Sequence, residues 1–205
     1  MTYLTEQSGK TIGMSMSGIA VHPWLFKPDT KYDANGVYNA SIRVPIEEAK
    51  DMMNELAQVF KEWAGKAPVK KENNMWRFEV DDKTGEETGH VIFNLKVKNK
   101  VNKKTGDLWD RKPPVFFTNA GDATPDVGGG SQMRVEFEVY RWNAEGKKGV
   151  SLQPISVLIE KVIVRENKAV ANRWGEGELA AFTEEAETNE ETNANTTQEE
   201  ASDFF

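Results

Sequence analysis

Basic and aromatic residues gather between residues 94 and 112, in the densest cluster of chemically informative side chains in the sequence. The alternation over residues 91–98 predicts a strand whose apolar residues point inward and whose lysines point outward. Cations that follow phosphates and flat rings that stack on bases are the two requirements for binding single-stranded nucleic acid. A solvated outer strand face explains the lysines as well. The predicted phosphate contacts here are Lys96, Lys98, Lys100, Lys103, Lys104, Arg111 and Lys112, and the predicted stacking ring is Trp109.

A second cluster follows a strongly alternating segment, residues 133–142. Its apolar residues share one face, and the phase of the strand places Tyr140 and Trp142 on the other. Two large rings on a polar face predict stacking platforms, with Arg141 between them as a further phosphate contact. A second small core beneath the loops is the alternative.

The sequence offers no constellation for catalysis. Asp81, Asp82 and Glu87 are the best candidates for a Mg²⁺-dependent nuclease, but they lie in a turn-rich segment where solvated acids are expected. The chain has no cysteine and only two histidines, far apart in sequence, which argues against thiolate or histidine-rich metal sites. The glycines at 128–130 lack the lysine of a phosphate loop. We therefore expect a protein that is not an enzyme and needs no metal or cofactor.

Periodicity predicts the elements that position these residues. Residues 46–64 carry apolar side chains at three- and four-residue spacing, which predicts one amphipathic helix ending at Gly65. Many strands and glycine-rich turns around one helix predict a mainly β fold, a small barrel capped by that helix. The predicted strands cover 11–21, 36–45, 75–80, 91–98, 115–118, 133–142 and 150–165, the last interrupted at Pro154.

Charge divides the 205-residue chain into a basic body and an acidic tail. All 26 Lys and Arg residues precede residue 175 and ten of the 33 acidic residues follow it, which leaves 23 acids and a net charge of +3 for residues 1–174. Residues 175–205 are too polar to bury a core, which predicts a disordered tail. Its end, Asp203-Phe204-Phe205, predicts a docking anchor, and a merely solubilising tail is the alternative. Spaced negative charge with a terminal ring imitates a nucleic-acid strand, so we expect the tail to compete for the same groove.

Several motifs in order resemble the phage-encoded single-stranded DNA-binding proteins of the T-seven phage type. The resemblance covers about residues 20–205 and depends on the set, because no single motif is specific. The motifs are KPD at 27–29, GVY at 36–38, a strand ending at Pro45, the helix, GGGS at 128–131, YRWN at 140–143, the strand VSLQPISVLIEKVIV at 150–164 and the acidic end DFF.

The resemblance implies a five-stranded OB-fold barrel with one inserted α-helix. It implies coating and protection of single-stranded DNA, without sequence preference, in phage replication, recombination and repair. It implies a homodimer in the cytoplasm of the infected bacterial host, with Phe204 and Phe205 contacting replication proteins such as a polymerase or a helicase-primase. We expect no membrane partner, because no apolar run approaches the roughly 20 residues that span a bilayer. A β-barrel adaptor that binds a peptide is the alternative, and RNA remains open as a ligand.

Overall fold

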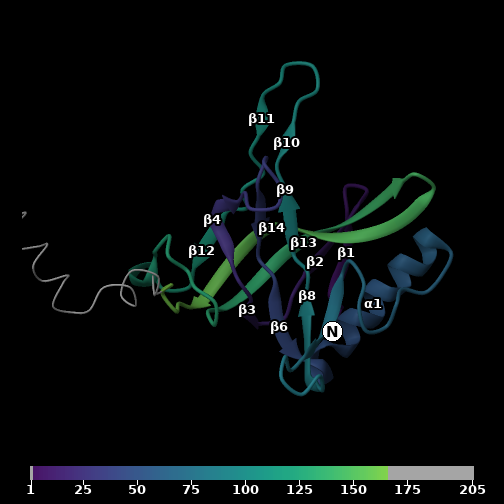
Figure 1. Ribbon diagram of the computed structural model, residues 1–205, viewed down its shortest axis with the longest axis horizontal. Coiled ribbons are helices and arrows are strands. Elements are labelled where there is room, and N and C mark those ends of the chain that lie inside the picture. Colours follow the sequence, from purple (N-terminus) through teal and green to yellow (C-terminus); the bar gives the residue numbers. More distant parts are fainter. Residues whose placement is uncertain (1, 166–205) are drawn as a thin grey trace, which may run out of the picture. The chain divides into compact units, whose positions relative to one another are not determined.

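The computed structural model describes residues 2–165 (Figure 1). The predicted domain boundary at residue 174, the acidic tail, and Asp203, Phe204 and Phe205 lie outside the described residues. Five barrel strands form the body. The first comprises β2 (Lys10–Met14) and β3 (Gly18–Ala20), the second β5 (Val37–Asn39) and β6 (Ile42–Pro45), the third β8 (Glu87–Phe93) and β9 (Lys96–Lys98), the fourth β13 (Gln132–Ala144) and the fifth β14 (Lys147–Lys161).

The strand order identifies the barrel as an OB-fold. The first barrel strand pairs with the second through β3 and β6, and the second pairs with the third through β6 and β8. β13 pairs with β2, β3 and β14, all antiparallel. A parallel bridge between Leu95 and Leu152 joins the third strand to the fifth and curls the sheet into a barrel. The resulting order, 1-2-3-5-4-1, is that of the five-stranded Greek-key OB barrel, as the resemblance implies.

The residues that the alternating pattern predicts to face inward fill the barrel interior. Val91, Phe93 and Leu95 of the third strand are fully buried, and so are Met133, Val135 and Phe137 of the fourth. A strand sends successive side chains to opposite faces, so this burial directs their neighbours outward. The third barrel strand therefore presents Lys96 and Lys98 on the outside of the barrel.

The single α-helix within residues 2–165, α1 (Ile46–Ala64), connects the second barrel strand to the third and has the predicted limits. Its apolar face covers the barrel through Ala49, Met52 and Leu56, which are fully buried. Gly65 ends the helix in the left-handed conformation, with φ 72°, and its N–H donates to the carbonyl of Lys61. Glycine adopts this conformation without steric strain.

Shorter elements surround the barrel. A hairpin made of β10 and β11, which we call the arm, projects well away from the body (Figure 1). The additional elements are β1 (Leu4–Gln7), β4 (Trp24–Asp29), β7 (Trp76–Val80), β10 (Lys100–Val101), β11 (Leu108–Trp109), β12 (Val115–Phe117) and the 3₁₀ turn η1 (Ala120–Asp122).

The structure corrects the expected strands in three places. Pro154 does not interrupt β14, because a register shift between Glu136 and Phe137 of β13 accommodates it and it pairs with Phe137. β14 spans Lys147–Lys161 rather than 150–165. The segment from residue 22 to 29, which lies outside all predicted strands, contains β4, which pairs with β5.

Candidate nucleic-acid interface

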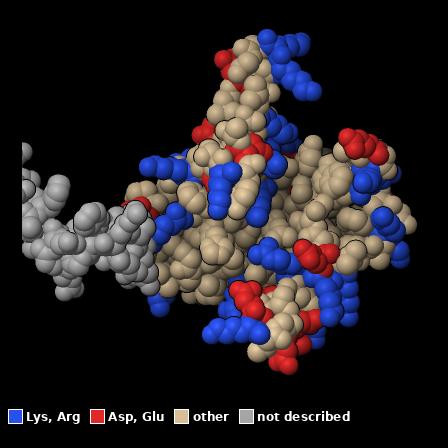
Figure 2. All heavy atoms as spheres, in the orientation of Figure 1, with Lys and Arg blue, Asp and Glu red and all other residues tan. Residues whose placement is uncertain are grey.

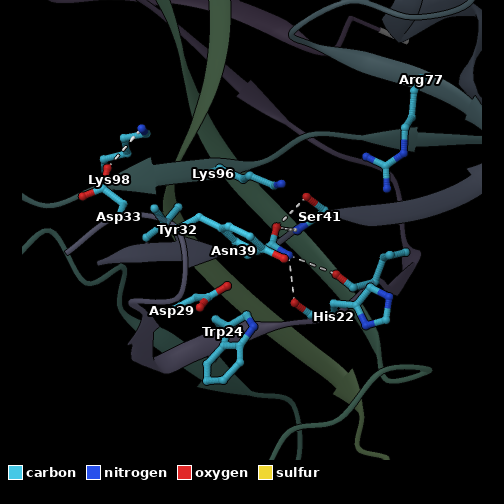
Figure 3. Close-up of a pocket in the computed structure, with 12 residues that line it drawn as sticks. His22, Trp24, Asp29, Tyr32, Asp33, Asn39, Ser41, Arg77, Lys96 and Lys98 are labelled. Carbon is cyan, nitrogen blue, oxygen red and sulfur yellow. Dashed lines mark hydrogen bonds and ion pairs between the residues drawn. The ribbon is translucent and has the colours of Figure 1, made fainter. Parts of the chain in front are cut away.

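A groove of about 380 Å³ lies on the outer face of the second and third barrel strands (Figure 3). The connection between the first and second strands, residues 21–36, forms its other side. The groove therefore combines strand residues, held rigidly by the barrel, with loop residues. It is lined by Val21, His22, Trp24, Asp29, Tyr32, Asp33, Val37, Asn39, Ser41, Arg77, Lys96 and Lys98.

Asn39 fixes the loop side of the groove to the barrel. Its amide Nδ2 donates to the carbonyls of Val21 and His22 at 3.1 and 2.8 Å, and its Oδ1 accepts from the backbone N–H and the hydroxyl of Ser41 (Figure 3). All polar atoms of this amide are thereby engaged in holding the wall. The groove is consequently a preformed feature of the fold.

Lys96 and Arg77 are the two cations of the groove without an ion-pair partner within residues 2–165. The pKa of Lys96 lies below its ordinary value because burial removes water from the ammonium and because the Arg77 guanidinium adds like charge. Arg77 is held in place by donating from Nη1 to Asn94 Oδ1 at 2.7 Å. The Asp29 carboxylate, which also lines the groove, offsets part of the lowering of the Lys96 pKa without forming an ion pair. Two neighbouring cations without ion-pair partners on a groove wall form an anion-binding site.

Lys98 differs because it has an acidic partner. Its ammonium lies 3.1 Å from Asp33 Oδ2 (Figure 3). The hydrogen bond from Lys98, together with one from the backbone of Asn35, holds the pKa of Asp33 below its ordinary value. A phosphate that contacts Lys98 must therefore compete with Asp33.

Two aromatic rings line the groove, and a cation lies over each of them. The Arg165 guanidinium lies 4.7 Å from the centre of the Trp24 ring, and Lys31 Nζ lies 5.1 Å from that of Tyr32. Tyr32 is 85% exposed. Rings of this kind provide stacking surfaces next to positive charge.

Predicted residues next to the groove form similar pairs. Lys100 Nζ lies 5.7 Å from the centre of the Tyr140 ring, which is 37% exposed on the outer face of β13. The Arg111 guanidinium lies 5.5 Å from the ring of Trp109, which is 61% exposed at the base of the arm. Arg111 also donates to Gln153 Oε1 of β14 at 2.7 Å. Because Lys100 pairs with Trp109 across the arm, the two cation–ring pairs lie next to each other.

The remaining predicted residues are dispersed. Lys103 and Lys104 occupy the exposed tip of the arm, and Lys112 lies 5.2 Å from the ring of Phe26. Arg141 has the strand phase opposite to Tyr140, and its Nη2 lies 3.8 Å from Glu6 Oε1 of β1. Trp142 lines a different hollow, beside the end of α1. These residues are not brought together with Lys96 and Lys98.

Two of the acids considered for nuclease chemistry, Asp81 and Glu87, are engaged in local contacts. Asp81 Oδ1 accepts hydrogen bonds from the backbone N–H groups of Lys83 and Thr84 at 2.9 Å, and those of Thr84 and then Lys83 hold its pKa below the ordinary value. Glu87 pairs with Lys71. Within residues 2–165, no group of three or more His, Asp or Glu side chains is arranged to hold a metal ion. No helix in this part of the chain is long and apolar enough to cross a membrane.

Sequence reasoning missed Arg77, Trp24 and Tyr32. Arg77 stands between two residues that pack inward, Trp76 and Phe78, and its outward position follows from the same alternation. Only the pairing of β7 with β8 reveals that it neighbours the third barrel strand. Trp24 and Tyr32 lie outside every predicted strand, and only the pairing of β4 with β5 brings this segment beside the groove.

Comparison with known proteins identifies the fold. No family model and no curated protein sequence matches the chain. The crystal structure of gp2.5, a single-stranded DNA-binding protein encoded by bacteriophage T7, matches with a TM-score of 0.56 and 20% identity, over 80% of this chain and 97% of that one. The chain has the fold of that protein. The fold resemblance expected from the sequence is confirmed.

A second phage protein shares the fold. The C-terminally truncated single-stranded DNA-binding protein of bacteriophage Enc34 matches with a TM-score of 0.52 and 14% identity, and the same phage's protein in complex with single-stranded DNA with 0.51 and 16%. Both matches cover 78% of this chain and 90% of the other.

Proposed function

We propose that this protein binds single-stranded DNA without sequence preference and has no enzymatic activity. The observation that carries the proposal is a pair of neighbouring cations, Lys96 and Arg77, in a preformed groove. Neither has an ion-pair partner within residues 2–165, and the groove is also lined by the exposed ring of Tyr32 and the half-buried ring of Trp24. The groove lies on the face of strands 2 and 3 and beside the loop between strands 1 and 2, where OB-folds bind oligonucleotides. The fold shared with phage proteins that bind single-stranded DNA supports the same function.

The mechanism combines two sequence-independent interactions. Lys96, Arg77 and Lys98 contact phosphates, and the rings of Trp24, Tyr32 and Tyr140 accept bases. Stacking contributes about 1–3 kcal/mol per base, and every base has a face to stack, so the strand is held without reading its sequence. Each phosphate contact contributes about −0.7 to the slope of log affinity against log salt.

The biological setting is part of the proposal. The protein coats and protects single strands during phage DNA replication, recombination and repair, in the cytoplasm of the infected bacterium. It acts as a homodimer, and the acidic tail recruits replication proteins and competes with DNA. The support is the ordered set of motifs shared with the T-seven type proteins, together with the acidic segment that ends Asp203-Phe204-Phe205.

A titration of intrinsic tryptophan fluorescence with a homopolymeric DNA strand tests the function. We expect quenching that weakens as salt rises, because phosphate contacts release counterions. Titration with RNA of the same base distinguishes the two nucleic acids. Absence of quenching and of any salt-dependent binding would overturn the proposal and favour the peptide-binding adaptor.

A further inference from the structure

A second hollow lies where the C-terminal end of α1 faces the tip of the β13–β14 hairpin. We call it the helix-side cleft; it has a volume of about 780 Å³ and is lined by the end of α1, residues 66–74 and residues 142–149. It shares no lining residue with the groove. Figure 1 shows the hairpin tip and the end of α1 next to each other, and Figure 2 shows Lys and Arg side chains over both.

The helix-side cleft is electropositive. Lys66, Lys147 and Lys148 line it together with a single acid, Glu72. All three lysines are exposed, and none has an ion-pair partner within the part of the chain that the structure describes. The Lys148 ammonium lies 4.9 Å from the centre of the Trp63 ring. The cleft therefore has uncompensated charge that suits a polyanion.

The cleft also holds a positioned aromatic ring, that of Trp142. A Cβ added to its cross-strand partner Gly149 would lie 2.0 Å from Trp142 Cζ2, so the indole rests directly on the glycine backbone. The carbonyl of Trp142 accepts a hydrogen bond of 3.1 Å from Trp63 Nε1 of α1. These contacts fix the hairpin to the helix and hold the indole at the cleft.

We propose that the helix-side cleft binds a second segment of the same single strand that occupies the groove. A base stacks beside Trp142, and Lys66, Lys147 and Lys148 contact the phosphates next to it. This inference rests on the proposed function and extends the bound strand beyond the groove.

Intermediate residues on the fourth barrel strand connect the two sites. Tyr140 and Trp142 lie two residues apart on one face of β13, about 7 Å along the strand, which is enough for separate bases. Lys100, which follows Lys96 and Lys98 along the chain, contacts the Tyr140 ring. Positive charge and rings thus lead from the groove, across Tyr140, to the cleft.

The double variant Lys147→Gln/Lys148→Gln tests the inference in the full chain. Wild-type and variant proteins are titrated with oligothymidylate of about 4 and about 16 nucleotides, the range of site sizes for one OB-fold. We expect unchanged affinity for the short strand. For the long strand we expect the salt slope to fall by about 0.7 for each lost phosphate contact.

The matched control is Lys50→Gln/Lys83→Gln, which removes two exposed lysines that line neither site. It should leave both titrations unchanged. The variant Trp142→Ala should weaken binding of the long strand roughly 5- to 150-fold, the range for losing one stacked base. Its thermal unfolding, compared with wild type, verifies that the hairpin remains folded.

The outcomes separate the two proposals. If wild-type protein binds neither length, the proposed function fails and the cleft site fails with it. If wild-type protein binds the long strand more tightly and the Lys147/Lys148 variant retains that whole gain and its salt slope, DNA binding stands and the cleft site is overturned. Tighter binding of both lengths by the variant would also overturn it, because it would indicate that the cleft holds the acidic tail.

Discussion

The Lys96 ammonium is electrostatically unfavourable in the unbound protein, and a phosphate would relieve this. Its pKa is lowered by burial and by Arg77, so the folded protein releases this proton at a lower pH than the unfolded chain does. Between these two pKa values the unfolded chain binds more protons than the folded protein does. The free energy of unfolding therefore rises with pH over this alkaline interval. A bound phosphate favours the charged form, so strand binding should take up a proton there.

We therefore expect proton uptake on binding at alkaline pH, on the acid side of the ordinary lysine pKa. Calorimetric titration in buffers of different ionisation enthalpy measures it. Lys96→Met should abolish the uptake and lower the salt slope by about 0.7, without loss of stability. Lys83→Met, in an exposed turn, is the control. Equal uptake by wild type and Lys96→Met would show that this ammonium does not meet the strand.

Tyr140 tests stacking at a single ring. Tyr140→Ala should weaken strand binding by about 1–3 kcal/mol, whereas Tyr140→Phe should retain most of the affinity, because the ring face and not the hydroxyl accepts the base. Fluorescence titration measures both. Phe116→Ala is a suitable comparison, since Phe116 is 57% exposed on β12 and lines neither hollow. Similar losses for Tyr140→Ala and Phe116→Ala would argue against a specific role for Tyr140.

The elements could be predicted from sequence where one face of a strand or helix is buried. The limits of α1, the inward residues of β8, β9 and β13, and the turn at Gly65 all follow from periodicity. The groove could not be predicted, because it depends on which strands neighbour each other. Arg77 and Lys96 are 19 positions apart in the chain, and only the antiparallel pairing of β7 with β8 brings the first near the third barrel strand. The association of Trp142 with α1 likewise depends on how far the β13–β14 hairpin extends.

Removal of the arm should weaken strand binding while leaving the free energy of unfolding nearly unchanged. Val101, Leu108 and Trp109 are exposed, and the hydrophobic core includes none of them. Replacing residues 101–108 by Asn-Gly, which closes a two-residue hairpin, should change the free energy of unfolding by about 0.5 kcal/mol or less. The salt slope should fall by up to about 1.4, because Lys103 and Lys104 are lost.

Chemical denaturation and salt-dependent titration measure these two effects. Lys103→Gln/Lys104→Gln keeps the arm and removes only its charge, so the same slope in both variants assigns the effect to the lysines. A slope unchanged in both would remove the arm from the interface.

The two parts of the chain carry opposite net charge: residues 1–174 are positive and residues 175–205 are negative. The first part therefore attracts the DNA polyanion, and the second repels it. Within residues 2–165, the buried residues of the hydrophobic core all lie between Ala20 and Ile159, so a chain ending at Trp174 retains the complete barrel. We expect this shortened chain to bind single-stranded DNA more tightly than the full chain at low salt. The difference should shrink as salt rises, because the screening length falls from about 10 Å at 0.1 M to about 3 Å at 1 M.

A full-length chain whose ten tail acids are changed to Asn or Gln separates charge from length. If it binds as tightly as the shortened chain, the acids themselves compete with DNA. A further variant, Phe204→Ala/Phe205→Ala, retains the acids and isolates the terminal rings. Full-length and shortened chains that bind with equal affinity at low salt would contradict competition by the tail, and would leave recruitment of other proteins as the proposed role of its acidic, aromatic end.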